Sequence, residues 1–364
     1  MKHTLRSLAS AHAHQFVLCA VSGFILWWFR FYFTSEAVAS VDLPSQIAIT
    51  EQLKMQLLDG RLSFYDPGSF SGWPVLQFYA FLPSLTAAGL ALLFETFAAD
   101  AVTLSIHVIL VVGMALLPFS LYYAALPLAR ELCNSDGELG NRYKATLALA
   151  VSIYAFWFLN HDEQYHGIGA AAPMNIGLYA QLFGWHFFLI HAGALLRFLK
   201  AGLPRDAVLT ALSYALLLAS HLLTFVFASF LVFMAFLWVR ERRLALIVTH
   251  IAGIALTGFW LAPMLAFMGE YTAYGVIRPK GDFLELFFRY PIYGLARSFA
   301  TWFNGDFKLL NPINVINLIL VFTLLAHRQI KKTGQLWMLF VSLLLAIILF
   351  SSGFVATSIP LGLH

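Results

Sequence analysis

The chain has 364 residues, of which 60% are hydrophobic and 11% are charged, and its formal net charge is +4. In a soluble protein this basic balance would suggest nucleic acid, but here the cations form small clusters beside apolar runs. The composition therefore argues against a nucleic-acid-binding domain. The chain has only two cysteines, Cys19 and Cys133, which argues against a disulfide or metal-thiolate framework. We expect an integral membrane protein.

Apolar runs near 20 residues are long enough to cross about 30 Å of hydrocarbon. The first run, residues 16 to 33, is too long and too aromatic for a cleaved signal peptide, so we expect an uncleaved span. The sequence predicts an all-α, polytopic helical bundle with about nine transmembrane helices and two interfacial helices on the outer face. We expect one membrane domain, with a main module (1–267), an outer loop (268–311) and further spans (312–364). The expected spans are 15–34, 101–129, 145–159, 176–199, 207–219, 223–239, 244–267, 312–327 and 335–352.

The distribution of charge predicts which connectors face the cytoplasm. Five basic clusters contain 14 of the 22 cations, and the positive-inside rule places all five, with the N-terminus, in the cytoplasm. Most acidic residues then fall outside, in a first connector (35–100), a second connector (160–175) and a third connector (268–311). We expect the chemistry at this outer face, and a multi-pass location in the plasma membrane, which in bacteria is the inner membrane. The clusters are Lys2/Arg6, Arg130/Arg142/Lys144, Arg197/Lys200/Arg205, Arg240/Arg242/Arg243 and Arg328/Lys331/Lys332.

Two apolar runs conflict with a simple count of spans. If residues 78–97 crossed the membrane, the basic connector between Arg130 and Lys144 would lie outside, so we expect an interfacial or re-entrant helix there. The run 207–239 would be about 50 Å long as one helix, and both its ends are basic. We therefore expect a helical hairpin that turns on the outer side near His221.

The first connector contains Asp42 directly before an expected helix, Leu43 to Leu58, which has Gln46, Thr50 and Lys54 along one stripe. Aspartate in this position is either a helix N-cap, which would satisfy free amide groups, or a functional carboxylate. Asp59 and Asp66 stand in turn signals and are expected to be turn residues. Further along, Tyr79 is a candidate substrate-binding residue.

The second connector holds the densest titratable cluster of the chain, two carboxylates flanked by two imidazoles. This set can bind a divalent cation such as Mg²⁺, Mn²⁺ or Zn²⁺, or perform general acid-base chemistry. Its spacing matches no fixed metal signature, so a solvated loop is an equal alternative. His221, at the expected hairpin turn, would point toward the same face and is a candidate substrate- or phosphate-binding residue. The candidate metal ligands are His161, Asp162, Glu163 and His166.

The third connector carries cations on the outer side, against the general trend, and we count Arg278, Lys280 and Arg289 as candidate phosphate ligands. The alternative is an ordinary interfacial loop with an aromatic belt. Four histidines within the spans are expected to make interhelical hydrogen bonds instead of carrying function. They are His107, His186, His191 and His250.

The order of these features resembles the GT-C superfamily of membrane glycosyltransferases, in particular its large bacterial members. The resemblance is carried by Asp42, Asp-Gly-Arg-Leu at 59–62, Gly-x-Pro at 72–74, Phe-Tyr-x-x-x-Pro at 78–83 and Phe-Trp-Leu-Ala-Pro at 259–263. It covers most of the chain, although each motif is degenerate. The chain departs from the family by its lone first-loop acid and by ending at His364, so it is either a fragment or a shortened member.

The resemblance implies that Asp42 is the catalytic base and that Asp162 and Glu163 help to hold a metal or the acceptor. The donor would be a polyprenyl-phosphate-linked sugar and the acceptor a glycan, lipid or protein, with no nucleic acid involved. Membrane lipids would surround the chain. Two alternatives of other classes are a non-catalytic transporter or flippase for a lipid-linked substrate, and an assembly subunit that has lost its chemistry.

Overall fold

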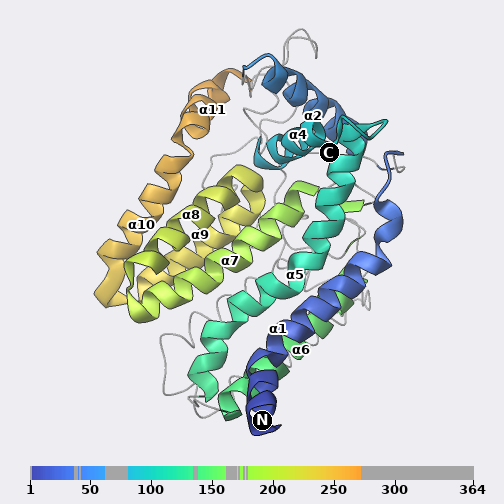
Figure 1. Ribbon diagram of the computed structural model, residues 1–364. Coiled ribbons are helices and arrows are strands. Elements are labelled where there is room, and N and C mark those ends of the chain that lie inside the picture. Colours follow the sequence, from blue (N-terminus) through green and yellow to red (C-terminus); the bar gives the residue numbers. More distant parts are fainter. Residues whose placement is uncertain are drawn as a thin grey trace, which may run out of the picture. The chain divides into compact units, whose positions relative to one another are not determined.

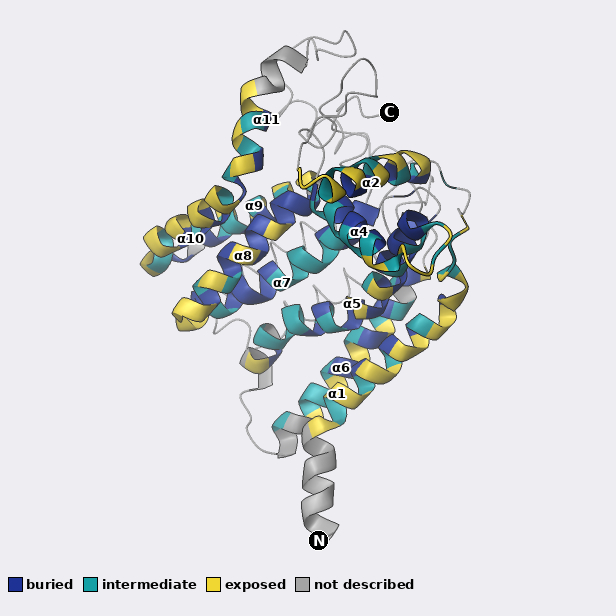
Figure 2. Cartoon of the chain, turned by 45° about the horizontal axis from the view of Figure 1, so that its top comes forward, coloured by how far each residue is buried: buried dark blue, intermediate teal, exposed yellow. Residues whose placement is uncertain are grey.

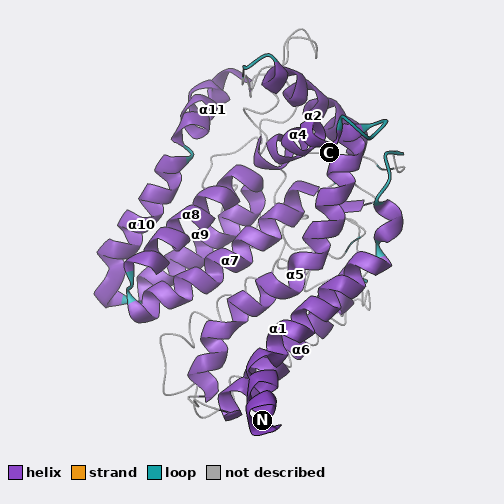
Figure 3. Ribbon diagram, in the orientation of Figure 1, coloured by secondary structure: helices purple, strands orange, loops and turns teal. Residues whose placement is uncertain are grey.

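A computed structural model describes residues 2–36, 40, 42–61, 81–133, 138–160, 170, 173–174, 177 and 179–271. This part of the chain contains ten α-helices and no strand, which confirms the all-α fold class (Figure 3). In chain order the elements are α1 (Lys2–Trp28), the 3₁₀ helix η1 (Arg30–Tyr32), α2 (Leu43–Leu58), α4 (Phe81–Phe94), α5 (Ala101–Cys133), α6 (Glu138–Leu159), α7 (Tyr179–Ala201), α8 (Pro204–Ser220), α9 (Leu222–Trp238), the 3₁₀ helix η4 (Arg240–Arg242), α10 (Arg243–Leu256) and α11 (Gly258–Tyr271).

The expected number of about nine spans is wrong for the described residues. Two helices are long and apolar enough to cross a membrane, Ala101–Pro127 and Tyr179–Ala201. A third span results if Thr224–Leu237 and Arg240–Leu256 together form one broken crossing. Helices also form at the other spans expected within 1–267. Of these, α1 and α6, which contain residues 15–28 and 145–159 of the expected spans, have 27 and 22 residues but are not among the candidate spans, and α8 and α9 have only 17 residues each, or about 26 Å of helix. The expected spans 312–327 and 335–352 lie outside the described residues.

The run 207–239 folds as the expected helical hairpin. Helix α8 ends at Ser220, His221 has an extended backbone, and α9 begins at Leu222. The Tyr214 hydroxyl lies 2.6 Å from the Ser229 hydroxyl, although 15 residues of continuous helix would separate them by about 22 Å. The expected single span 244–267, in contrast, is broken into α10 and α11 at Thr257.

The first connector also forms its expected helices. Helix α2 has the bounds that the sequence predicts, with Gln46, Thr50 and Lys54 on its buried side. Helix α4 has only 14 residues, about 21 Å of helix, which is too short to cross about 30 Å of hydrocarbon. Its length agrees with an interfacial or re-entrant segment, while the side on which it lies stays a prediction.

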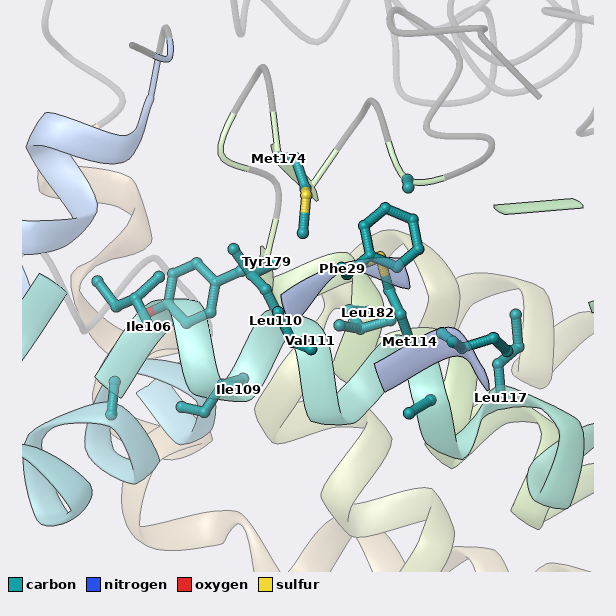
Figure 4. Close-up of a cluster of buried hydrophobic side chains, with 14 of the residues drawn as sticks. Phe29, Ile106, Ile109, Leu110, Val111, Met114, Leu117, Met174, Tyr179 and Leu182 are labelled. Carbon is teal, nitrogen blue, oxygen red and sulfur yellow. The ribbon is translucent and has the colours of Figure 1, made fainter. Parts of the chain in front are cut away.

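The chain divides into two compact units. The first comprises residues 1–229 and 241–261; the second comprises 230–240 and 262–364, of which the structure describes 230–240 and 262–271. Within the first unit, α1 lies along α6, while α5 packs on α7, α7 on α8, and α8 on α10 (Figure 1). Its main hydrophobic core follows α5, where Phe29, Tyr179 and Leu182 surround residues such as Ile106 and Met114 (Figure 4).

Glycine permits the close approach of α10 to α8. A β-carbon at Gly253 would lie 2.8 Å from the backbone oxygen of Ala211 and 3.4 Å from the side chain of Tyr214. Small residues at such contacts let helix backbones approach closely, which is the usual means of packing helices in a membrane.

Gly253→Ala is therefore expected to lower the melting temperature of the purified protein, because overpacking costs about 1–3 kcal/mol. Gly23→Ala is the matched control, since Gly23 lies inside α1 and its β-carbon would meet nothing within 4 Å. Alanine favours a helix interior over glycine by about 0.8–1 kcal/mol, so this control should leave the melting temperature unchanged or raise it. Equal melting temperatures for both variants would contradict the proposed packing.

Candidate functional site

Asp42 stands at the N-cap position of α2, but its carboxylate makes no capping hydrogen bond. Its backbone has φ −100° and ψ −13°, which is close to helical, whereas a capping residue usually has an extended backbone. The Asp42 carbonyl accepts two hydrogen bonds, from the Ser45 hydroxyl at 2.7 Å and from the Gln46 amide at 3.1 Å. These two hydrogen bonds hold the Asp42 backbone, and neither involves the Asp42 carboxylate.

A second aspartate, Asp100, does cap the helix that it precedes. Asp100 precedes α5, where one carboxylate oxygen accepts from the Thr103 amide at 2.9 Å and the other from the Thr103 hydroxyl at 2.6 Å. Both aspartates directly precede a helix, yet only Asp100 uses its side chain for the helix. The N-cap alternative for Asp42 therefore loses its main support, and the functional alternative gains.

The end of the second connector lies directly against Asp42. Helix α7 begins at Tyr179 instead of the expected 176, so Gly177 belongs to the connector. A β-carbon on Gly177 would be 2.6 Å from the backbone nitrogen of Leu43 and 3.1 Å from the carbonyl carbon of Asp42. Gly177 also has φ +90°, a conformation that favours glycine. The structure thereby brings the first and second connectors together at Asp42, backbone against backbone.

Two polar contacts link α2, α4 and α7 to one another. The buried hydroxyls of Ser84 in α4 and Tyr179 in α7 lie 2.8 Å apart. In α2, the Lys54 ammonium lies 2.7 Å from Glu51 and 3.5 Å from Glu95, which follows α4. The hydrogen bond to Glu51 raises the pKa of Lys54, so this cation stays charged and binds α2 to the end of α4. The Ser84–Tyr179 contact thus joins α4 to α7 two residues after Gly177, whereas Lys54 joins α2 to the end of α4 twelve residues after Asp42, or about 18 Å along α2.

The structure places His221 at the turn of the hairpin, in contact with α7. Its Nδ1 atom is hydrogen-bonded to the Thr224 hydroxyl, and a β-carbon on Gly184 would be 2.9 Å from the His221 β-carbon. Burial lowers the pKa of the His221 imidazole to about 4. The ring is therefore neutral near pH 7, and the role of His221 toward a substrate or phosphate stays a prediction.

The remaining candidate residues lie outside the described residues. These are the four candidate metal ligands His161, Asp162, Glu163 and His166, the candidate substrate residue Tyr79, and the candidate phosphate ligands Arg278, Lys280 and Arg289. Within the described ranges, no group of three or more histidine, cysteine, aspartate or glutamate residues is placed to hold a metal ion. Their roles, and a role for Mg²⁺, Mn²⁺ or Zn²⁺, stay predictions.

Sequence reasoning missed three residues of the site, Gly177, Ser84 and Tyr179. A lone glycine, serine or tyrosine beside an apolar run has no distinguishing spacing, so the sequence offered no signal for them. Comparisons with protein-family models, with curated proteins and with solved structures find no match.

Gly177→Ala should lower the melting temperature because the methyl group both collides with the Leu43 backbone and strains a positive φ. Gly60→Ala isolates the second effect, since Gly60 has φ +65° but its β-carbon would meet nothing within 4 Å. A left-handed backbone costs about 1–2 kcal/mol at a non-glycine residue, so Gly177→Ala should be clearly the more destabilising of the two. Equal shifts in a thermal unfolding assay would contradict the close contact at Asp42.

Proposed function

We propose that the protein is a membrane glycosyltransferase that moves a sugar from a polyprenyl-phosphate donor to an acceptor hydroxyl at the outer face of the plasma membrane. The single observation that supports it most is the carboxylate of Asp42, which heads α2 without capping it and lies where the second connector meets the first. Most motifs of the resemblance to the GT-C superfamily lie in the first of these connectors. A carboxylate kept out of structural hydrogen bonds is available as a base.

In the proposed reaction Asp42 takes the proton from the acceptor hydroxyl while the hydroxyl oxygen attacks the anomeric carbon. The new glycosidic bond forms as the bond from the anomeric carbon to the phosphate oxygen breaks, and the lipid phosphate leaves with the electron pair. Arg278, Lys280 and Arg289 are the proposed ligands for the phosphate charge that develops. A divalent cation held by Asp162 and Glu163 would supply further stabilisation of that charge.

Asp42→Asn is expected to abolish sugar transfer while leaving folding and donor binding largely intact. The substitution keeps the side-chain size, and loss of a general base typically lowers the rate by about 10² to 10⁴-fold. The measurement is sugar transfer from a radiolabelled polyprenyl-phosphate donor in membranes, with donor binding measured separately.

Asp59→Asn serves as the control because Asp59 is the C-cap of α2 and makes its contacts through its backbone amide. This variant should retain transfer. Wild-type transfer by Asp42→Asn would reject the catalytic assignment and favour the transporter or the inactive subunit.

The proposed orientation places the N-terminus and the basic connector between α5 and α6 in the cytoplasm, and α4 with its following turn outside. Single cysteines at Ala99 and Asn141, in a chain whose native Cys19 and Cys133 are replaced by serine, test this placement. An impermeant thiol reagent applied to intact cells should label Ala99→Cys and spare Asn141→Cys. Labelling of both, or of position 141 alone, would overturn the orientation.

A further inference from the structure

Helix α1 carries a stripe of exposed aromatic side chains on the side away from the core. Phe24, Trp27 and Trp28 follow the spacing i, i+3, i+4 within α1, which places them on one face, and Phe31 follows in η1. These residues are 42%, 54%, 43% and 65% exposed in that order. The opposite face is buried at Leu18, Ser22, Ile25 and Phe29. Exposed residues along the outer side of α1 are visible in Figure 2.

The rings of this stripe contact one another and a ring of α6. Phe24 lies 5.7 Å from Trp27, 5.9 Å from Trp28 and 5.5 Å from Phe156, measured between ring centroids. Trp28 is also 6.2 Å from Phe156 in an edge-to-face arrangement. The four rings make one continuous aromatic surface across two neighbouring helices, which we name the α1/α6 aromatic surface.

Arg30 is held at the end of this surface. Its guanidinium donates a hydrogen bond of 2.7 Å to the Trp27 carbonyl, and its central carbon lies 4.6 Å from the centroid of the Trp27 ring. A guanidinium stacked on an indole is fixed in position while its remaining N–H groups stay available, and its fork of donors matches a phosphate. Arg30 itself is exposed.

The α1/α6 aromatic surface differs in composition from the exposed face of α8. The exposed face of α8 carries aliphatic side chains, Val208, Leu212 and Leu216. Aliphatic side chains are sufficient for a protein surface that contacts only the acyl chains of lipids. Tryptophan with a neighbouring cation is typical of the level at which acyl chains give way to phosphate headgroups. Both the composition and the charge of the surface therefore fit a phospholipid.

We propose that the α1/α6 aromatic surface binds a membrane phospholipid, with the lipid phosphate on Arg30 and an acyl chain along Phe24, Trp28 and Phe156. The bound lipid would fix the depth of α1 in one leaflet. This inference is independent of sugar transfer, because it concerns a lipid that anchors the protein and is not consumed.

Native mass spectrometry of the delipidated full-length protein with added phosphatidylglycerol tests the proposal. Arg30→Gln should weaken retention of the lipid by about tenfold or more, since a charge-assisted contact is lost. Arg205→Gln is the matched control, because Arg205 is an exposed arginine in the first turn of α8, outside this surface. Trp27→Leu with Trp28→Leu should weaken retention as well, and Arg30→Lys should give an intermediate result.

Diacylglycerol, which lacks the phosphate, should not be retained. The proposal fails if Arg30→Gln and Arg205→Gln bind phosphatidylglycerol equally, or if diacylglycerol is retained as well as phosphatidylglycerol, because the surface would then be a general aromatic belt. The proposal also fails if an isoprenyl phosphate displaces phosphatidylglycerol when the isoprenyl phosphate is present at one tenth of the phosphatidylglycerol concentration. The melting temperature of Arg30→Gln, expected to equal that of the wild type, separates loss of binding from loss of folding.

Discussion

The backbone contact between Gly177 and the Asp42–Leu43 peptide determines how closely the first and second connectors meet. A β-carbon 2.6 Å from the Leu43 nitrogen would force the two chains apart, so only glycine allows this distance. Two residues later Tyr179 begins α7 and reaches Ser84 in α4. The close approach therefore brings the start of α2 to the start of α7, and the Ser84–Tyr179 contact joins α4 to the same end of α7.

Buried histidines join neighbouring helices of the same bundle. His186 donates from Nε2 to the Gly113 carbonyl at 2.8 Å, because a carbonyl only accepts, and its Nδ1 then accepts from the Ser120 hydroxyl at 2.7 Å. His191 in α7 likewise contacts the Thr210 carbonyl in α8. The expected interhelical role is confirmed for these two, whereas His107 contacts the Thr34 carbonyl and His250 contacts Leu246 within its own helix.

The sequence predicted local structure well and tertiary placement poorly. The bounds of α2 and the break at His221 follow from apolar periodicity, charge and length, all of which act over short distances along the chain. The number of spans was overestimated because composition marks apolar runs but does not reveal where a helix ends, as at Thr257. The contact of Gly177 with Asp42 joins residues 135 positions apart, and no pattern in a single sequence encodes it.

The start of α2 explains why Asp42 is free of a capping role. A capping carboxylate accepts from the amide of the second or third helical residue, but the second residue here is Pro44, which has no N–H. The third residue, Ser45, instead donates its hydroxyl to the Asp42 carbonyl. Proline thus removes one of the two donors that would hold the carboxylate on the helix, and the Asp42 backbone is fixed by other means. The Asp42 carboxylate is thus not required for the helix that it precedes, which is the condition that its proposed role as a base needs.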